Sequence, residues 1–359
     1  MSHLTSFQQS LTEQGYDAAI VTDKLNVHYL AGFALDDAVV LVLQNAAFLL
    51  TDFRYVEAAR ENVCQGMQIL TPEDSRTDAI RMLLNEHHCE RVAVEEDALS
   101  LSQFERYRKT FVGVTLEGGA SALLSQLRLC KTDDEIAMIA RAQDITDAAF
   151  DHILKVMTPE MTEIDVALEL EMYMRRQGAE GLAFETIAVS GTNSSRPHGV
   201  PRPVKLEKGF LTMDFGARLN GYCSDMTRTV VLGRADAEMK KVYETVRTAQ
   251  AVALEAIREG VGCRALDEAA RAVIYGAGYK GCFGHSLGHG VGMYIHEEPR
   301  VSPNADEGSV LERGHVVTVE PGIYIAGKYG CRIEDMVAVC NDGSIRNFTK
   351  STKELIELF

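Results

Sequence analysis

The sequence lacks the features that mark membrane proteins and nucleic-acid-binding proteins. It has no apolar run of about 18 residues, the length that a transmembrane helix needs. It also has no lysine and arginine block long enough to follow a phosphate backbone, and 36 basic against 52 acidic residues give a formal net charge of −16. We therefore expect neither a nucleic acid nor a membrane as a partner, and divalent cations suit the acidic balance better.

The eight cysteines form neither a CxxC pair nor the dense framework that stabilises small secreted domains. Residues 1–16 contain Gln, Glu and Ser where a secretory signal would have a basic segment followed by an apolar one. Both absences favour a reducing compartment, and we predict a cytoplasmic location.

A chain of 359 residues exceeds what one hydrophobic core usually supports, so we expect two domains. From residue 17 to about residue 118, short β-branched runs alternate with helical patterns, which predicts a small α/β domain. The predicted strands are 17–22, 38–52 and 91–96. The predicted helices are 55–61, 77–86 and 101–109. A boundary region near residues 121–131 follows the Gly118-Gly119 pair and precedes a long amphipathic helix pattern at residues 133–157. We assign residues 1–124 to the first domain and 125–359 to the second.

The second domain contains an internal duplication, which constrains its fold strongly. The segment 158–181 aligns with 258–281, and LEKGFLTMDFG at 206–216 corresponds to LERGHVVTVEPG at 311–322. Each of the latter segments is followed by a strand pattern that carries a carboxylate. Chance similarity between amphipathic helices would not reproduce this order of strand, acid and glycine. We therefore predict two similar halves that face each other.

Each half places one acid at the end of a predicted strand and another acid on the next predicted strand. These are Asp214 and then, on the next predicted strand, Asp225 in the first half, and Glu320 and then, on the next predicted strand, Glu334 in the second. Pseudo-symmetry should bring the four together, and their repulsion calls for about two divalent cations. His289 lies among glycines that allow close backbone approach and leave its imidazole free to point inward. This oxygen-rich set favours Mn²⁺, Co²⁺, Zn²⁺ or Fe²⁺ at a hydrolytic site over a structural zinc.

Four blocks of the sequence resemble the metal-site blocks of the pita-bread metallopeptidases, especially the Xaa-Pro aminopeptidases and Xaa-Pro dipeptidases (prolidases). The blocks are MDFGARLNGYCSDMTRT, GHSLGHGVGMYIHEEPR, TVEPGIYI and GCRIEDMVAV, and YLAGF at 29–33 resembles the creatinase-type N-terminal domain of that family. The resemblance implies an α/β creatinase-like domain followed by a duplicated α+β pita-bread catalytic domain. It also implies a homodimer that acts on short peptides.

By this resemblance, the five candidate ligands hold two metal ions, with Mn²⁺ as the first expectation and Co²⁺ or Zn²⁺ as alternatives. Asp214 would bind one ion, His289 and Glu320 would bind the other, and Asp225 and Glu334 would bridge the two. A hydroxide between the ions would be the nucleophile and Glu320 the general base.

Three further histidines are candidates for contacts with the substrate. His198 lies in RPHG at nearly the position in the first half that His296 has in the second. The resemblance implies that His198 shapes the substrate site and that His296 binds the substrate carbonyl or the developing oxyanion, so both are catalytic candidates. His285 would line the prolyl pocket.

Arg300, Arg332 and Tyr324 complete the predicted site. Arg300 is either an ordinary surface arginine or the partner of a dipeptide's terminal carboxylate. Arg332 lies two residues before Glu334, on the same strand face, and should brace a ligand carboxylate. Tyr324 is expected to do the same.

We expect hydrolysis of a peptide bond whose nitrogen belongs to proline. That nitrogen carries no N–H, so the enzyme must accept the ring and protonate the nitrogen as it leaves. The sequence leaves open whether the substrate is a dipeptide or the N-terminus of a longer peptide, and which metal is native. The alternatives are an enzyme similar to methionine aminopeptidase, which would not need the first domain, and a non-catalytic pita-bread peptide-binding protein, which would not need intact ligands.

Overall fold

The computed structural model describes residues 2–359, which divide into two compact units between Arg128 and Leu129. The division lies on the C-terminal side of the predicted boundary between residues 124 and 125. The reason is that helix α6 (Ala120–Leu129) begins directly after Gly119 and spans that predicted boundary. Within residues 2–359, no helix is both long and apolar enough to cross a membrane.

The first unit is an α/β fold around a mixed six-stranded sheet with the order β4-β3-β2-β1-β5-β6. Its strands are β1 (Ala18–Val21), β2 (Val39–Leu43), β3 (Ala47–Leu50), β4 (Gln68–Leu70), β5 (Arg91–Val94) and β6 (Thr115–Glu117). Its helices are α1 (His3–Glu13), α2 (Lys24–Ala31), α3 (Val56–Asn62), α4 (Arg76–Glu86) and α5 (Leu101–Thr110). The predicted run 38–52 is an antiparallel hairpin of β2 and β3, because the chain reverses at residues 44–46.

The second unit contains two matching helix pairs. α7 (Asp133–Val156) and α8 (Glu163–Arg176) correspond to α9 (Ala237–Ala256) and α10 (Cys263–Gly276). The first helix of each pair ends at residue 156 or 256, and the second helix runs from 163 to 176 or from 263 to 276. Each of these positions is thus 100 residues from its counterpart in the other pair. The helices therefore follow the predicted duplication.

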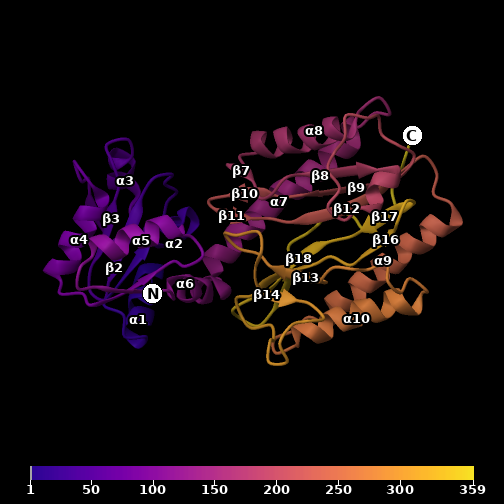
Figure 1. Cartoon of the computed structure of the whole chain (residues 1–359). Helices are drawn as coiled ribbons and strands as arrows, with labels where there is room; N and C mark the ends of the chain where they lie inside the picture. Colours follow the sequence, from indigo (N-terminus) through magenta and orange to yellow (C-terminus); the bar gives the residue numbers. More distant parts are fainter. Residues whose placement is uncertain (1) are drawn as a thin grey trace. The chain divides into compact units, whose positions relative to one another are not determined.

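The strands of the two halves form separate sheets between the helix pairs (Figure 1). The first sheet has the order β20-β12-β9-β8, with β8 (Ile187–Ser190), β9 (Gly209–Phe215), β12 (Met226–Leu232) and β20 (Glu357–Leu358). The second has the order β14-β13-β15-β18-β19, with β13 (Gly288–Gly290), β14 (Glu297–Val301), β15 (Val316–Val319), β18 (Asp335–Val339) and β19 (Ile345–Asn347).

The second unit also contains smaller elements. They are β7 (Gly181–Leu182), β10 (Ala217–Leu219) and β11 (Tyr222–Cys223) in one small sheet, the hairpin of β16 (Gly322–Ile325) and β17 (Tyr329–Arg332), and the 3₁₀ helix η1 (Gly191–Ser195). The apolar faces of α9 and α10 pack mainly on the second half, and those of α8 and the later part of α7 pack on the first. The start of α7 packs on the second half through Ile136, Ile139 and Ala140. Burial of each large aliphatic side chain there contributes about 2 kcal/mol.

The strand registers place all four candidate acids at strand ends. Asp214 is the penultimate residue of β9, and Asp225 directly precedes β12, which pairs with β9 in antiparallel register. Glu320 directly follows β15, and Glu334 directly precedes β18, the antiparallel partner of β15. The two halves thus present their acids in the same way.

Candidate active site

A cavity of about 380 Å³ in the second unit collects the predicted site residues. All of them except Tyr324 line it: His198, Asp214, Asp225, His285, His289, His296, Arg300, Glu320, Arg332 and Glu334. Residues that are more than 100 positions apart in the sequence therefore share one cavity because the two halves meet there.

His289 lies among the carboxylates. Its Nε2 is 3.6 Å from Asp225 Oδ2 and 3.5 Å from Glu320 Oε1. One potential ligand atom each from Asp225, His289 and Glu334 lies within 4.8 Å of the other two, and all three residues are buried. This cluster has the size and the donor types of a metal-binding site.

The backbone around His289 fixes which ring nitrogen is free. Its Nδ1 lies 3.1 Å from the carbonyl oxygen of Gly290, which can only accept, so Nδ1 carries the proton and donates. Burial lowers the pKa of His289 to about 3, so the ring is neutral. The lone pair of Nε2 therefore faces the carboxylates, the arrangement that metal-binding histidines require.

The buried acids need a positive counter-charge. Burial and repulsion from neighbouring carboxylates raise the pKa values of Asp225 and Glu334 well above their usual range. Burial likewise raises the pKa of Glu320 to about 8. Asp214 Oδ1 is buried and has no hydrogen-bond partner. The residues present therefore fit divalent cations, which would neutralise the acids and bind this free oxygen.

Arg332 and Tyr324 form a directed hydrogen-bond chain beside the acids. Arg332 Nη2 donates to Asp214 Oδ2 at 2.6 Å, and its Nη1 donates to the Tyr324 hydroxyl at 2.7 Å. His285 donates through Nδ1 to the Ser286 carbonyl, so its Nε2 accepts from the Tyr324 hydroxyl at 2.9 Å. Arg332 thus contacts a candidate ligand directly, whereas Tyr324 reaches it only through Arg332.

His198, His296 and Arg300 lie at the solvent-exposed side of the cavity. The ring of His296 meets that of His289 edge-on, with centroids 4.5 Å apart. Burial lowers the pKa of His296, so it is neutral at physiological pH. The exposed position of Arg300 leaves its guanidinium accessible to an incoming ligand.

Several residues at the site were missed by sequence reasoning. Apolar side chains form part of the cavity wall, namely Phe184, Ile187, Pro197 and Ile295, and Glu185 and Ser286 also line it. Thr227 accepts from Arg332 Nε at 2.9 Å and donates to Glu334 Oε2 at 2.7 Å. Its position two residues after Asp225, on the same strand face, is a signal that could have identified it.

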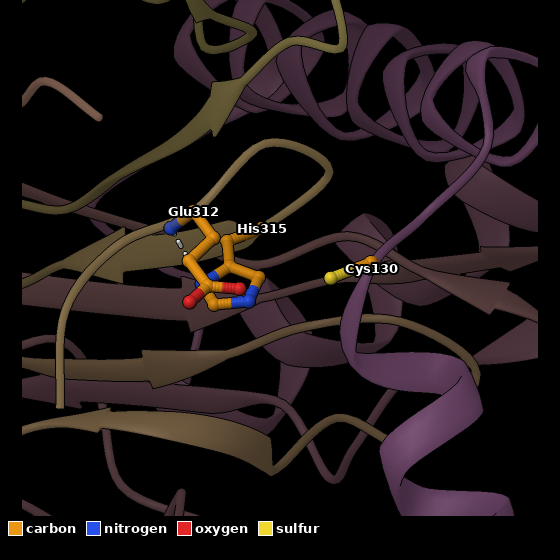
Figure 2. A group of neighbouring side chains, drawn as sticks. All are labelled: Cys130, Glu312 and His315. Carbon is orange, nitrogen blue, oxygen red and sulfur yellow. Dashed lines mark hydrogen bonds between the residues drawn. The ribbon is translucent and has the colours of Figure 1, made fainter. Parts of the chain in front are cut away.

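A second group of potential metal ligands consists of Cys130, Glu312 and His315 (Figure 2). None of the three lines the cavity. The backbone N–H of Glu312 donates to His315 Nδ1 at 3.1 Å. A neutral His315 must therefore carry its proton on Nε2, so this nitrogen has no lone pair for a metal. Cys130 and Glu312 are also exposed, and we assign no metal to this group.

Gly290 has no room for a side chain. A Cβ there would lie 2.1 Å from the carbonyl oxygen of Glu298 on β14. We expect Gly290→Ala to lower the free energy of unfolding by about 1–3 kcal/mol, since β14 must move. Gly276→Ala is the control, because no atom lies within 4 Å of its added Cβ and alanine favours the helix. Equal urea midpoints for Gly290→Ala and the unaltered protein would contradict the prediction.

Comparison with known proteins identifies the family. Residues 137–341 match the metallopeptidase family M24, and residues 3–130 match the creatinase/prolidase N-terminal domain. An Xaa-Pro dipeptidase of Pyrococcus furiosus is 36% identical over 348 residues, which cover 96% of this chain and 97% of the relative.

Two solved structures are similar over nearly the whole chain. An Xaa-Pro dipeptidase from Bacillus anthracis has a TM-score of 0.94 and 39% identity and covers 99% of both chains. An X-Pro aminopeptidase from Thermotoga maritima has a TM-score of 0.91 and 34% identity, with coverage of 98% of this chain and 100% of the other. These matches confirm the predicted fold class of a creatinase-like domain followed by a pita-bread domain. The chain therefore belongs to metallopeptidase family M24 and is a metallopeptidase with a creatinase/prolidase N-terminal domain.

Proposed function

We propose that this metallopeptidase hydrolyses the Xaa-Pro bond of dipeptides, using two divalent metal ions. The observation that carries the proposal is the cavity lined by four acids and by His289, whose Nε2 is free, with Arg300 at its exposed side. Relatives named Xaa-Pro dipeptidase support the substrate class. Cleavage of Xaa-Pro at the N-terminus of longer peptides is the second candidate, because a similar structure is named an X-Pro aminopeptidase.

The proposed metal ligands are Asp214, Asp225, His289, Glu320 and Glu334. Four carboxylates and one imidazole suit Mn²⁺ first, with Co²⁺ and Zn²⁺ as alternatives, since hard oxygen donors dominate. When bound, such ions would lower the pKa of a water molecule and polarise the scissile carbonyl.

Glu320 is the proposed general base. Its Oε1 lies 3.5 Å from His289 Nε2, and its Oε2 lies 3.9 Å from His285 Nδ1, so the carboxylate lies between these two histidines. In this role it would take a proton from the attacking water and deliver it to the proline nitrogen as the peptide bond breaks. That delivery is needed because the tertiary nitrogen has no proton of its own.

The remaining cavity residues have proposed roles in binding. His198 and His296 lie at the exposed side, where a neutral His296 can donate a hydrogen bond to the substrate carbonyl. His285 packs edge-on against Phe283, with ring centroids 5.0 Å apart, and offers a flat wall for the prolyl ring. Phe184 and Ile295 add apolar surface for the residue before proline or for the ring itself.

Arg300 is the proposed partner of the dipeptide's terminal carboxylate. We expect Arg300→Ala to raise KM for Ala-Pro by about tenfold or more, the value of a lost charge-assisted hydrogen bond, with a smaller change in kcat. Arg346→Ala is the matched control, because Arg346 lies outside the cavity, on exposed strand β19. An unchanged KM in Arg300→Ala would refute this role and leave the metal site unaffected.

The direct test compares Ala-Pro with Ala-Pro-Ala-Ala as substrates. Metal-stripped protein is reconstituted separately with Mn²⁺, Co²⁺ and Zn²⁺, and initial rates are measured by chromatography of the products. Higher kcat/KM for Ala-Pro supports the dipeptidase, and higher kcat/KM for the tetrapeptide would replace it with the aminopeptidase. Absence of cleavage with every metal would refute both and favour another peptide substrate or a peptide-binding role.

We also propose a cytoplasmic homodimer with short peptides as its partners. The eight cysteines are all free in the structure, which suits a reducing compartment. Light scattering of the purified protein tests the stoichiometry, and a monomer mass would refute the dimer.

A further inference from the structure

Arg228 connects the two strands that begin next to candidate metal ligands. β12 starts directly after Asp225, and β18 starts directly after Glu334. These strands belong to different sheets and share no β-ladder, so regular strand pairing does not set the distance between them. Arg228 lies on β12, its side chain is only 1% exposed, and it extends toward β18.

Every N–H group of the Arg228 guanidinium has an acceptor. The donors pair as follows: Nε with the Thr352 carbonyl at 3.1 Å, Nη1 with the carbonyls of Thr227 at 2.9 Å and Glu334 at 2.6 Å, and Nη2 with Asp335 Oδ1 and the Ser351 carbonyl, both at 2.8 Å. A guanidinium has five N–H donors, so its capacity is fully used. The acceptors come from β12, from the start of β18 and from the C-terminal tail.

These contacts hold Glu334 on several sides. Its carbonyl accepts from Arg228, its backbone N–H donates to the Thr227 carbonyl at 3.1 Å, and its Oε2 accepts from the Thr227 hydroxyl at 2.7 Å. Asp335, the next residue, is the ionic partner of Arg228. These contacts fix the position of Glu334 relative to β12, and therefore relative to Asp225.

The far side of this clamp is itself fixed. Asp335 also accepts from Lys353 Nζ at 2.6 Å and from Asn347 Nδ2 at 2.7 Å. Ser351 donates through its backbone N–H to Asp147 on α7 at 2.8 Å, which anchors the tail. Arg228 therefore links segments that cannot easily relax toward one another.

We infer that Arg228 is a positioning residue that sets the spacing between Asp225 and Glu334, and with it the capacity of the site to hold a pair of divalent ions. The inference rests on the proposed function, because the proposed function makes Asp225 and Glu334 ligands of the metal ions. Stability alone is a weaker explanation, since a buried ion pair often contributes little net free energy compared with apolar packing. Lysine cannot substitute, because one ammonium has three donors and no planar fork.

The experiment titrates metal-stripped protein with Mn²⁺ by calorimetry and records the Mn²⁺ EPR spectrum of the loaded protein. The variants are Arg228→Lys and Arg228→Met. The control is Arg202→Met, which breaks another arginine pair to a buried acid, Glu163, outside the metal cluster, with contacts of 2.9 and 2.8 Å. For Arg228→Lys we expect a folded protein, at least one Mn²⁺ bound about tenfold more weakly, loss of the exchange-coupled spectrum of a close pair, and a fall in kcat larger than the rise in KM.

Arg202→Met should lose thermal stability and keep both Mn²⁺ affinities. Two Mn²⁺ ions bound by Arg228→Lys with unaltered affinity and spectrum would overturn the inference and leave the proposed function standing. An unaltered protein that binds no pair of ions would instead refute the two-metal proposal itself. If neither Arg228 variant folds, Arg228 serves stability alone and the inference is also overturned.

Discussion

Glu320→Ala should lower kcat/KM for an Xaa-Pro dipeptide by about 10³-fold or more, because the change removes a proposed metal ligand and the proposed general base together. Glu320 directly follows β15, with its carboxylate between His285 and His289. Asp225 and Glu334 cannot take over both functions, since each is itself a proposed metal ligand. The measurement is steady-state kinetics with saturating Mn²⁺, together with the metal content of the purified variant.

Glu320→Gln separates the two roles, since an amide oxygen can still bind a metal but the group cannot take up a proton at neutral pH. We expect it to keep more bound metal than Glu320→Ala and to be similarly inactive. Glu312→Ala is the control, because Glu312 is an exposed acid a few residues before the same strand. A kcat for Glu320→Ala within tenfold of the unaltered enzyme would contradict the mechanism.

Removal of the metal ions should abolish turnover and also change how stability depends on pH. The pKa of Glu320 is raised by burial to about 8 in the metal-free protein, against an ordinary value of 4.5. Between these values the folded state binds more protons than the unfolded state, so the stability of the stripped protein should fall as pH rises from about 4.5 to about 8. Repulsion among Asp225, Glu334 and Glu320 acts in the same direction.

Divalent ions should reverse this trend by favouring the ionised carboxylates. Each ion at about 100 times its dissociation constant stabilises the folded state by about 2.7 kcal/mol, provided that it binds only that state. Urea unfolding at several pH values, with EDTA and with Mn²⁺, measures both effects. Identical unfolding curves with and without Mn²⁺ at pH 8 would show that the acids do not bind the ion.

Much of the fold was accessible from local patterns. The Thr132 and Thr162 capping boxes, the amphipathic helices and the β-branched strands are short-range signals, and the elements lie close to the predicted ranges. Helices α1, α2 and α6 were missed, although Asp23 caps the start of α2 and Gly32 ends it with a positive φ of 87°. The run 38–52 was not resolved into a hairpin, because its turn lacks the usual Asn-Gly or Asp-Gly signal.

By itself, the sequence determined the types of group at the site and their pairing, because the duplication gives each half an acid at a strand end and another beside the next strand. Only the tertiary structure decided the proton position on His289, the hydrogen-bond chain from Arg332 to His285, the apolar wall and the clamp by Arg228. Each depends on a carbonyl, a hydroxyl or an apolar surface brought into place by strand register and by the meeting of two sheets. Such long-range contacts leave no periodic pattern in the residues that make them.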